Sequence, residues 1–141
     1  MIIRNRLIPF GSFLAINLCG LIFVRRGHAF TPTDLNHERI HTRQQLELLY
    51  LPFFLLYLLE WLFRLLQILL KPKPFAQPLV ASKPRRTINP EPLTINPEPL
   101  TNSPFLRAYY RISFEREAYI HQSDPDYLLH RPLFAWFRYL R

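Results

Sequence analysis

The chain has 141 residues, a formal net charge of +8 and 14 prolines. This length allows one domain at most. A single cysteine, Cys19, excludes an internal disulfide and a cysteine-rich zinc knuckle, and its apolar neighbours predict a buried, unreactive thiol. Because basic residues flank the apolar runs and no nucleic-acid motif is present, the positive charge favours anionic lipid over nucleic acid as the partner.

The N-terminal stretch has features of both a membrane span and a strand. Residues 7–24 carry no charge, which just reaches the length of a membrane-spanning helix. Proline, glycine and asparagine interrupt the run, and residues 21–24 are strand formers. We therefore expect one or two strands ending near Arg25, and a membrane helix is the alternative.

The next predicted element carries a metal-binding motif. The sequence TPTD is typical of a helix start, and the helix is expected to cover about residues 34–50. Within it, NHERIH contains His37 and His41 at the spacing His-Glu-x-x-His. At about 100° per residue, the two histidines lie one turn apart on the same helix face, as zinc ligands do. Glu38 lies beside them, where a carboxylate is able to accept a proton from water.

The most apolar stretch, residues 51–70, predicts a helix long enough to cross a bilayer. Glu60 and Arg64 lie in its midst one turn apart, and charges inside a membrane are unfavourable unless they are paired. Residues 71–104 follow as a predicted disordered, proline-rich linker in which TINPEPL occurs twice in succession. A repeat this short, without a hydrophobic period, cannot build a core.

A second motif, SFEREAY, occupies residues 113–119 and predicts another helix, with Ser113 as its N-cap. It offers Glu115 or Glu117 as a third metal ligand. The two side chains point about 200° apart around a helix, so only one is able to face the metal. His121 and His130 are further candidates without supporting spacing, and the aromatic, arginine-rich C-terminus is expected to pack on the core or at a membrane surface.

Together, NHERIH and FEREAY resemble the motifs of the gluzincin metallopeptidases, whose third-ligand helix often carries Glu-x-x-Ala. They also resemble short bacterial membrane-associated proteins with the same two motifs. The resemblance implies that His37, His41 and Glu115 bind zinc and that Glu38 is the catalytic base. Tyr119 stands where aspartate is commoner in the family, and its hydroxyl is a candidate donor to an oxyanion.

The expected fold is α+β and mostly helical. Short N-terminal strands or a hairpin, the motif helix and the long apolar helix make up residues 1–70. C-terminal helices with the third ligand make up residues 105–141, and both parts form one composite domain. A metal site requires that residues 51–70 not cross the membrane once, because the ligands would then lie on opposite sides.

Two functions follow from these expectations. The first is a zinc-dependent metallopeptidase that hydrolyses a peptide or protein substrate. It would be monotopic or peripheral at the bacterial cytoplasmic membrane, held by residues 51–70 and their basic flanks. The second is a non-catalytic membrane-associated protein, including a single-span anchor, in which the metal motif is structural, degenerate or coincidental.

Overall fold

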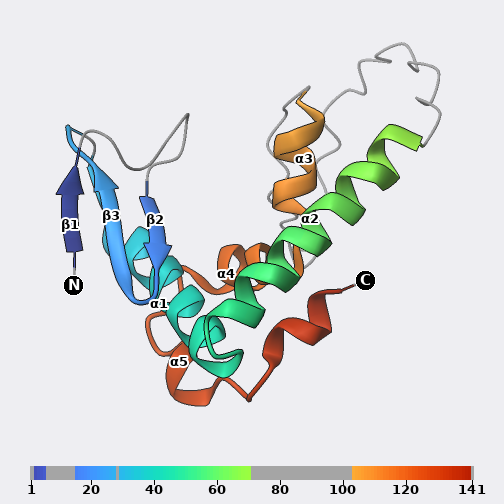
Figure 1. Ribbon diagram of the computed structural model, residues 1–141. Coiled ribbons are helices and arrows are strands. Elements are labelled where there is room, and N and C mark those ends of the chain that lie inside the picture. The colour runs from blue at the N-terminus through green and yellow to red at the C-terminus, as the bar shows by residue number, and fades with distance from the viewer. Residues whose placement is uncertain (1, 6–14, 28, 71–102, 141) are drawn as a thin grey trace, which may run out of the picture.

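The computed structural model describes residues 2–5, 15–27, 29–70 and 103–140 (Figure 1). This part of the chain is mostly helical with a small N-terminal sheet, as the sequence predicts. The predicted linker lies outside the described residues up to residue 102. Its last two residues, Ser103 and Pro104, belong to the following helix as N-cap and first residue, so the C-terminal part begins two residues earlier than expected.

The sheet has the order β1-β3-β2, from strands β1 (Ile2–Asn5), β2 (Ala15–Leu18) and β3 (Leu21–Arg25). β3 pairs antiparallel with β2 and parallel with β1. The strand prediction is thus confirmed over residues 15–24, whereas residues 6–14 lie outside the described part. The sequence did not predict β1, because four residues in a basic segment give too little pattern to identify a strand.

Cys19 and Gly20 form the two-residue turn between β2 and β3, with φ angles of 53° and 81°. Positive φ at both central residues matches the twist of an antiparallel hairpin. The cysteine is exposed there, so the prediction of a buried thiol is wrong. Apolar neighbours in the sequence indicate burial only within a strand, and a turn residue projects away from the sheet.

Helix α1 (Pro32–Glu47) carries the histidine motif and starts within the TPTD segment, as predicted, where Thr31 and Asp34 form a capping box. The backbone N–H of Asp34 donates to the Thr31 hydroxyl at 3.2 Å, and the Asp34 carboxylate accepts from the Thr31 N–H at 2.8 Å. The helix ends three residues before its predicted end, because Leu49 and Tyr50 take positive φ angles of 54° and 61°. These two residues turn the chain into the next helix.

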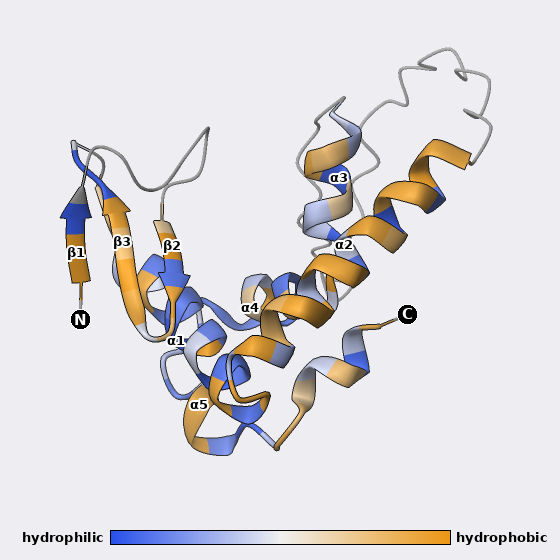
Figure 2. Ribbon diagram, viewed as in Figure 1, coloured by the Kyte–Doolittle hydropathy of each residue, from blue (hydrophilic) through white to orange (hydrophobic). Residues whose placement is uncertain are grey.

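Helix α2 (Leu51–Leu70) is long and apolar enough to cross a membrane. Its exposed residues are all leucine, phenylalanine or proline, whereas its polar residues are half-buried (Tyr57, Glu60, Trp61, Arg64 and Gln67). The exposed face of the helix is therefore apolar, and Figure 2 shows hydrophobic residues along most of its length. Its side toward the protein is mixed, because it includes both the buried Phe53 and the half-buried polar residues. A helix on the surface of a soluble domain exposes its polar residues instead.

The C-terminal part consists of α3 (Pro104–Tyr110), α4 (Ser113–His121), α5 (Tyr127–His130) and the 3-10 helix η1 (Ala135–Tyr139). α3 lies along α2, and α4 contacts both α1 and η1 (Figure 1). The central hydrophobic cluster joins these elements through Phe53, Ile112, Phe114 and Trp136.

The two charges within α2 have a structural role at the start of α4. The Glu60 carboxylate accepts hydrogen bonds from the Ser113 N–H at 3.0 Å and the Ser113 hydroxyl at 2.6 Å. Arg64 pairs with Glu60 at 3.0 Å, as the spacing of one turn predicts. The prediction of Ser113 as N-cap is wrong, because Ile112 precedes the helix and the serine hydroxyl binds Glu60 instead. Glu60 thus holds in place the helix that carries Glu115.

A buried ionic cluster joins the end of α1 to α4 and the C-terminal tail. The Arg131 guanidinium, whose side chain is 1% exposed, pairs with Glu47 at 4% and Glu117 at 0%. Glu117 also accepts from the Tyr127 hydroxyl at 2.9 Å and from the Gln44 amide at 3.1 Å. One cation therefore compensates two buried carboxylates.

Replacing Arg131 by alanine is expected to lower the free energy of unfolding by about 3–5 kcal/mol, because two buried carboxylates lose their cation. Urea denaturation followed by circular dichroism in a mild detergent measures this change. Arg43→Ala, at an exposed position of α1, is the control and should have little effect. Equal denaturation midpoints for the two variants would contradict the role assigned to the cluster.

Candidate metal centre

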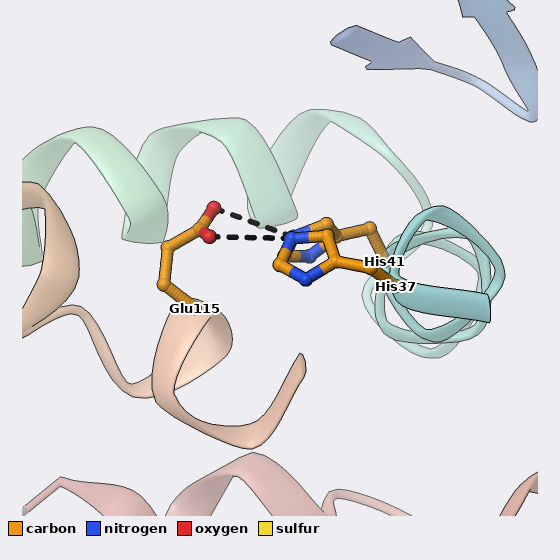
Figure 3. Close-up of side chains that lie close together, drawn as sticks. All are labelled: His37, His41 and Glu115. Atoms are coloured by element: carbon orange, nitrogen blue, oxygen red, sulfur yellow. Dashed lines mark hydrogen bonds and ion pairs between the residues drawn. The ribbon is translucent and has the colours of Figure 1, made fainter. Parts of the chain in front are cut away.

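Two histidines of α1 and one glutamate of α4 meet in the interior (Figure 3). The Nε2 atoms of His37 and His41 lie 3.0 Å apart. Nε2 of His41 lies 3.3 Å from Oε1 of Glu115, and Nε2 of His37 lies 3.5 Å from Oε2 of the same carboxylate. All three side chains are buried. The structure therefore brings together the three residues that the sequence proposed as ligands.

Asn36, the first residue of the NHERIH motif, fixes the distance between the two helices. Its side-chain amide donates to the carbonyl oxygens of His121, Gln122 and Asp124, at 3.3, 3.0 and 2.7 Å. The His121 and Gln122 carbonyls lie at the C-terminal end of α4, where a helix leaves carbonyls without internal partners, and the Asp124 carbonyl lies in the turn that follows. The motif thus contains a residue that joins α1 to α4, a role that no local sequence pattern indicates.

Each of the three candidate ligands contacts one further polar side chain. Nδ1 of His37 contacts Oε1 of Gln122 at 3.2 Å, and Nδ1 of His41 contacts Oε1 of Gln44 at 2.8 Å. The Tyr57 hydroxyl donates to Oε1 of Glu115 at 2.7 Å. Sequence reasoning missed all three partners. Only Gln44 had a local signal, since it lies three residues after His41 on the same helix face.

Gln44 determines which nitrogen of His41 carries the proton. Its amide nitrogen donates to the Phe114 carbonyl and the Glu117 carboxylate, both at 3.1 Å, so its oxygen must face the imidazole. Nδ1 of His41 is therefore a donor, and in neutral His41 the Nε2 lone pair points toward Glu115. This is the tautomer that a metal ligand requires.

The centre fits a divalent cation because two imidazole nitrogens and a carboxylate converge there. Oε2 of Glu115 is buried and has no hydrogen-bond partner among the described residues. Two nitrogen ligands about 2.0–2.1 Å from a tetrahedral zinc ion lie about 3.3 Å apart, close to the 3.0 Å seen between His37 and His41. Nitrogen and oxygen donors of this kind suit zinc, which takes two histidines and a glutamate at known catalytic sites.

Without a metal, protons take up the charge in this cluster. Burial alone would lower the pKa of His41, but the charge and hydrogen bond of Glu115 raise it to about 9. Burial opposes ionisation of Glu115, yet His41 and His37 together hold the pKa of this carboxyl well below its usual value. The carboxylate is therefore charged, as a metal ligand must be.

Glu38 lies beside the cluster and is 8% exposed. Burial raises the pKa of its carboxyl, and the neighbouring His41 and His37 partly offset this effect. Its backbone carbonyl accepts from the Asn17 amide at 2.6 Å, which ties β2 to the motif helix. Arg39, the next residue, is exposed and points away, as its place on the helix predicts.

Tyr119, the second predicted catalytic residue, contacts the His37 ring edge to face, with 4.6 Å between the ring centroids. It lines a small cavity of about 100 Å³ together with His37, Glu38 and Gln122. Burial and the charge of Glu115 raise the pKa of its phenol. The hydroxyl therefore keeps its proton and is able to act as a donor.

The other candidate ligands lie elsewhere. Glu117 is paired with Arg131 and lies on the opposite side of α4 from the cluster, so Glu115 is the glutamate that faces the histidines. The His121 ring stacks on Tyr127 with 3.7 Å between ring centroids, and its Nε2 contacts the hydroxyl of Tyr139. His130 is exposed.

Comparison of the chain with protein families, curated proteins and solved structures finds no match. The class of the site is therefore argued from its own geometry. The arrangement is a candidate metal centre of two histidines and one glutamate, with a buried carboxylate beside it.

The purified protein is expected to bind one zinc ion per chain, measured by elemental analysis and competition with a chromophoric chelator. His41→Ala and Glu115→Ala should each weaken zinc binding by more than about a hundredfold, since loss of an outer partner alone costs ten- to hundredfold. His130→Ala, at an exposed histidine outside the cluster, is the control and should retain zinc. Full zinc retention in both ligand variants would refute the assignment.

Gln44→Leu is expected to weaken zinc binding by about ten- to hundredfold, because His41 loses the acceptor that fixes its tautomer. The same chelator competition measures the effect. Gln45→Leu is the neighbouring control, since the Gln45 amide donates to the Asn17 backbone. If both variants bound zinc as tightly as the native chain, Gln44 would have no orienting role.

Proposed function

We propose that this protein is a membrane-associated zinc metallopeptidase of the gluzincin type. The observation that carries the proposal is the convergence of His37, His41 and Glu115 with the buried carboxylate of Glu38 beside them. A purely structural zinc site is typically closed by four protein ligands. Here three ligands come together, and they line a cavity from which a substrate is able to approach.

The proposed reaction is hydrolysis of a peptide bond. His37, His41 and Glu115 would hold the zinc ion, which would supply a Lewis acid for the peptide carbonyl and for a water molecule. Glu38 accepts the proton of that water and then delivers it to the leaving amine. Tyr119, whose hydroxyl stays protonated, donates a hydrogen bond to the developing oxyanion.

The location at a membrane rests on the exposed face of α2. An uninterrupted apolar face of this length is unusual on a soluble monomer and is typical of a membrane contact. The ligands come from both sides of α2 in the sequence yet meet at one centre, which argues against a single crossing. We therefore favour a helix that lies in the membrane interface or enters without crossing, with the net charge of +8 attracting anionic lipid.

Glu38→Gln tests the proposed chemistry directly. The variant is expected to lose about 10²- to 10⁴-fold in the rate of peptide hydrolysis, because the proton acceptor is gone, and to keep one zinc per chain. Fluorogenic peptide cleavage and zinc stoichiometry are measured on the same samples, with Arg39→Ala as an exposed control. Undiminished hydrolysis in zinc-loaded Glu38→Gln would refute the mechanism, and a zinc-loaded native chain without hydrolysis would favour the non-catalytic alternative.

A further inference from the structure

A cavity of about 500 Å³ lies directly beside the candidate metal centre. Its polar end includes the three candidate ligands and Glu38. The remaining wall comes from β2, α2 and α3 and is mostly apolar, with side chains that include Ile16, Phe53, Leu58, Trp61, Phe105 and Leu106. This volume falls in the range of sites for small ligands and leaves room for large side chains.

The cavity is continuous with the outer apolar surface of the protein. Leu58 of α2 and Phe105 of α3 both line the cavity, yet they are 51% and 57% exposed. They therefore form its rim and also belong to the surface proposed to contact lipid. Trp61, which stacks on Phe105 with 6.2 Å between ring centroids, closes this end of the wall. The rim of the cavity thus lies on the surface proposed to contact lipid.

We propose that the substrate is an apolar peptide segment that enters this cavity from the lipid bilayer. The inference rests on the proposed peptidase function and specifies its substrate class. A leucine or phenylalanine side chain of the substrate that moves from the bilayer into this cavity exchanges contacts with lipid for contacts with apolar protein side chains. A charged or amide side chain would lose its water there and find few polar partners.

The polar groups of the wall favour a peptide over a lipid acyl chain. They lie at the metal end of the cavity, where the proposed peptidase chemistry requires the scissile bond, and the apolar wall extends from there to the rim. A peptide with apolar side chains beside the scissile bond matches both ends of the cavity.

The test uses the full, zinc-loaded chain in phosphatidylcholine–phosphatidylglycerol vesicles. One fluorogenic peptide has leucine and phenylalanine around the scissile bond, and its partner has serine and asparagine at those positions. The apolar peptide is expected to be cleaved with a kcat/KM about ten- to hundredfold higher, as burial of one large apolar side chain implies. Leu58→Trp, which fills the rim, should lower this value at least about tenfold.

Leu59→Trp is the matched control, because Leu59 is 53% exposed on the same helix but does not line the cavity. Equal kcat/KM for the two peptides, equal effects of the two tryptophan variants, or release of fatty acid from phospholipid in place of peptide cleavage would each overturn the inference.

Peptide binding to the Glu38→Gln variant tests this inference separately from the proposed peptidase function. Energy transfer from a dye on Cys19, the sole and exposed cysteine, to a labelled peptide reports binding without hydrolysis. Preferential binding of the apolar peptide, weakened by Leu58→Trp, supports the inference even if the native chain cleaves nothing. Cleavage of both peptides without preferential binding supports the peptidase and overturns the inference.

Discussion

Three buried hydrogen-bond acceptors meet at one point in this protein, and that arrangement is unfavourable unless positive charge lies between them. The two Nε2 atoms and the Glu115 carboxylate come from helices separated by the whole of α2 and the segment after it. Hydrogen bonds at both ends of α4 hold this helix in place. Asn36 ties α1 to the C-terminal end of α4, and Glu60 holds its N-terminal end.

The polar side chains of the interior form connected layers around this point. Gln44 binds His41 on one side and Glu117 on the other, and Glu117 is neutralised by Arg131. A change in the ionic cluster is therefore transmitted to the imidazole through a single amide. These connected contacts explain why so many charged and amide groups are buried in a small chain, since each group forms a hydrogen bond or ion pair with the next. Removing one of these groups would leave its neighbour buried without a partner.

Local rules explain what the sequence could predict. The spacing of His37 and His41 requires only helix geometry, and the helix start requires only the segment from Thr31 to Asp34. The features that the sequence did not predict depend on contacts in the tertiary structure. The choice of Glu115 over Glu117 depends on Arg131, which no spacing rule connects to either residue. Cys19 and Ser113 were misassigned for the same reason, because a turn and a partner on α2 determine their surroundings.

Composition alone does not predict the contacts of the long apolar helix α2 or the turn that precedes it. Its charges are unfavourable for a single membrane crossing, yet composition gives no indication that Glu60 would cap another helix. Nor does it indicate that Leu49 and Tyr50 turn the chain between α1 and α2 through left-handed backbone conformations. Such conformations are strained for residues other than glycine and persist where surrounding contacts fix them. Without that turn, Tyr57 would not reach Glu115.

Tyr57 gives α2 a second consequence. The helix that presents leucine and phenylalanine to its surroundings also places a phenol 2.7 Å from a carboxylate oxygen of the candidate centre. The position of α2 therefore affects two equilibria, namely the partition of the protein into a bilayer and the binding of a metal ion. If lipid holds α2 where Tyr57 meets Glu115, then ion capture must in turn strengthen partition by the same factor, since such coupling is reciprocal.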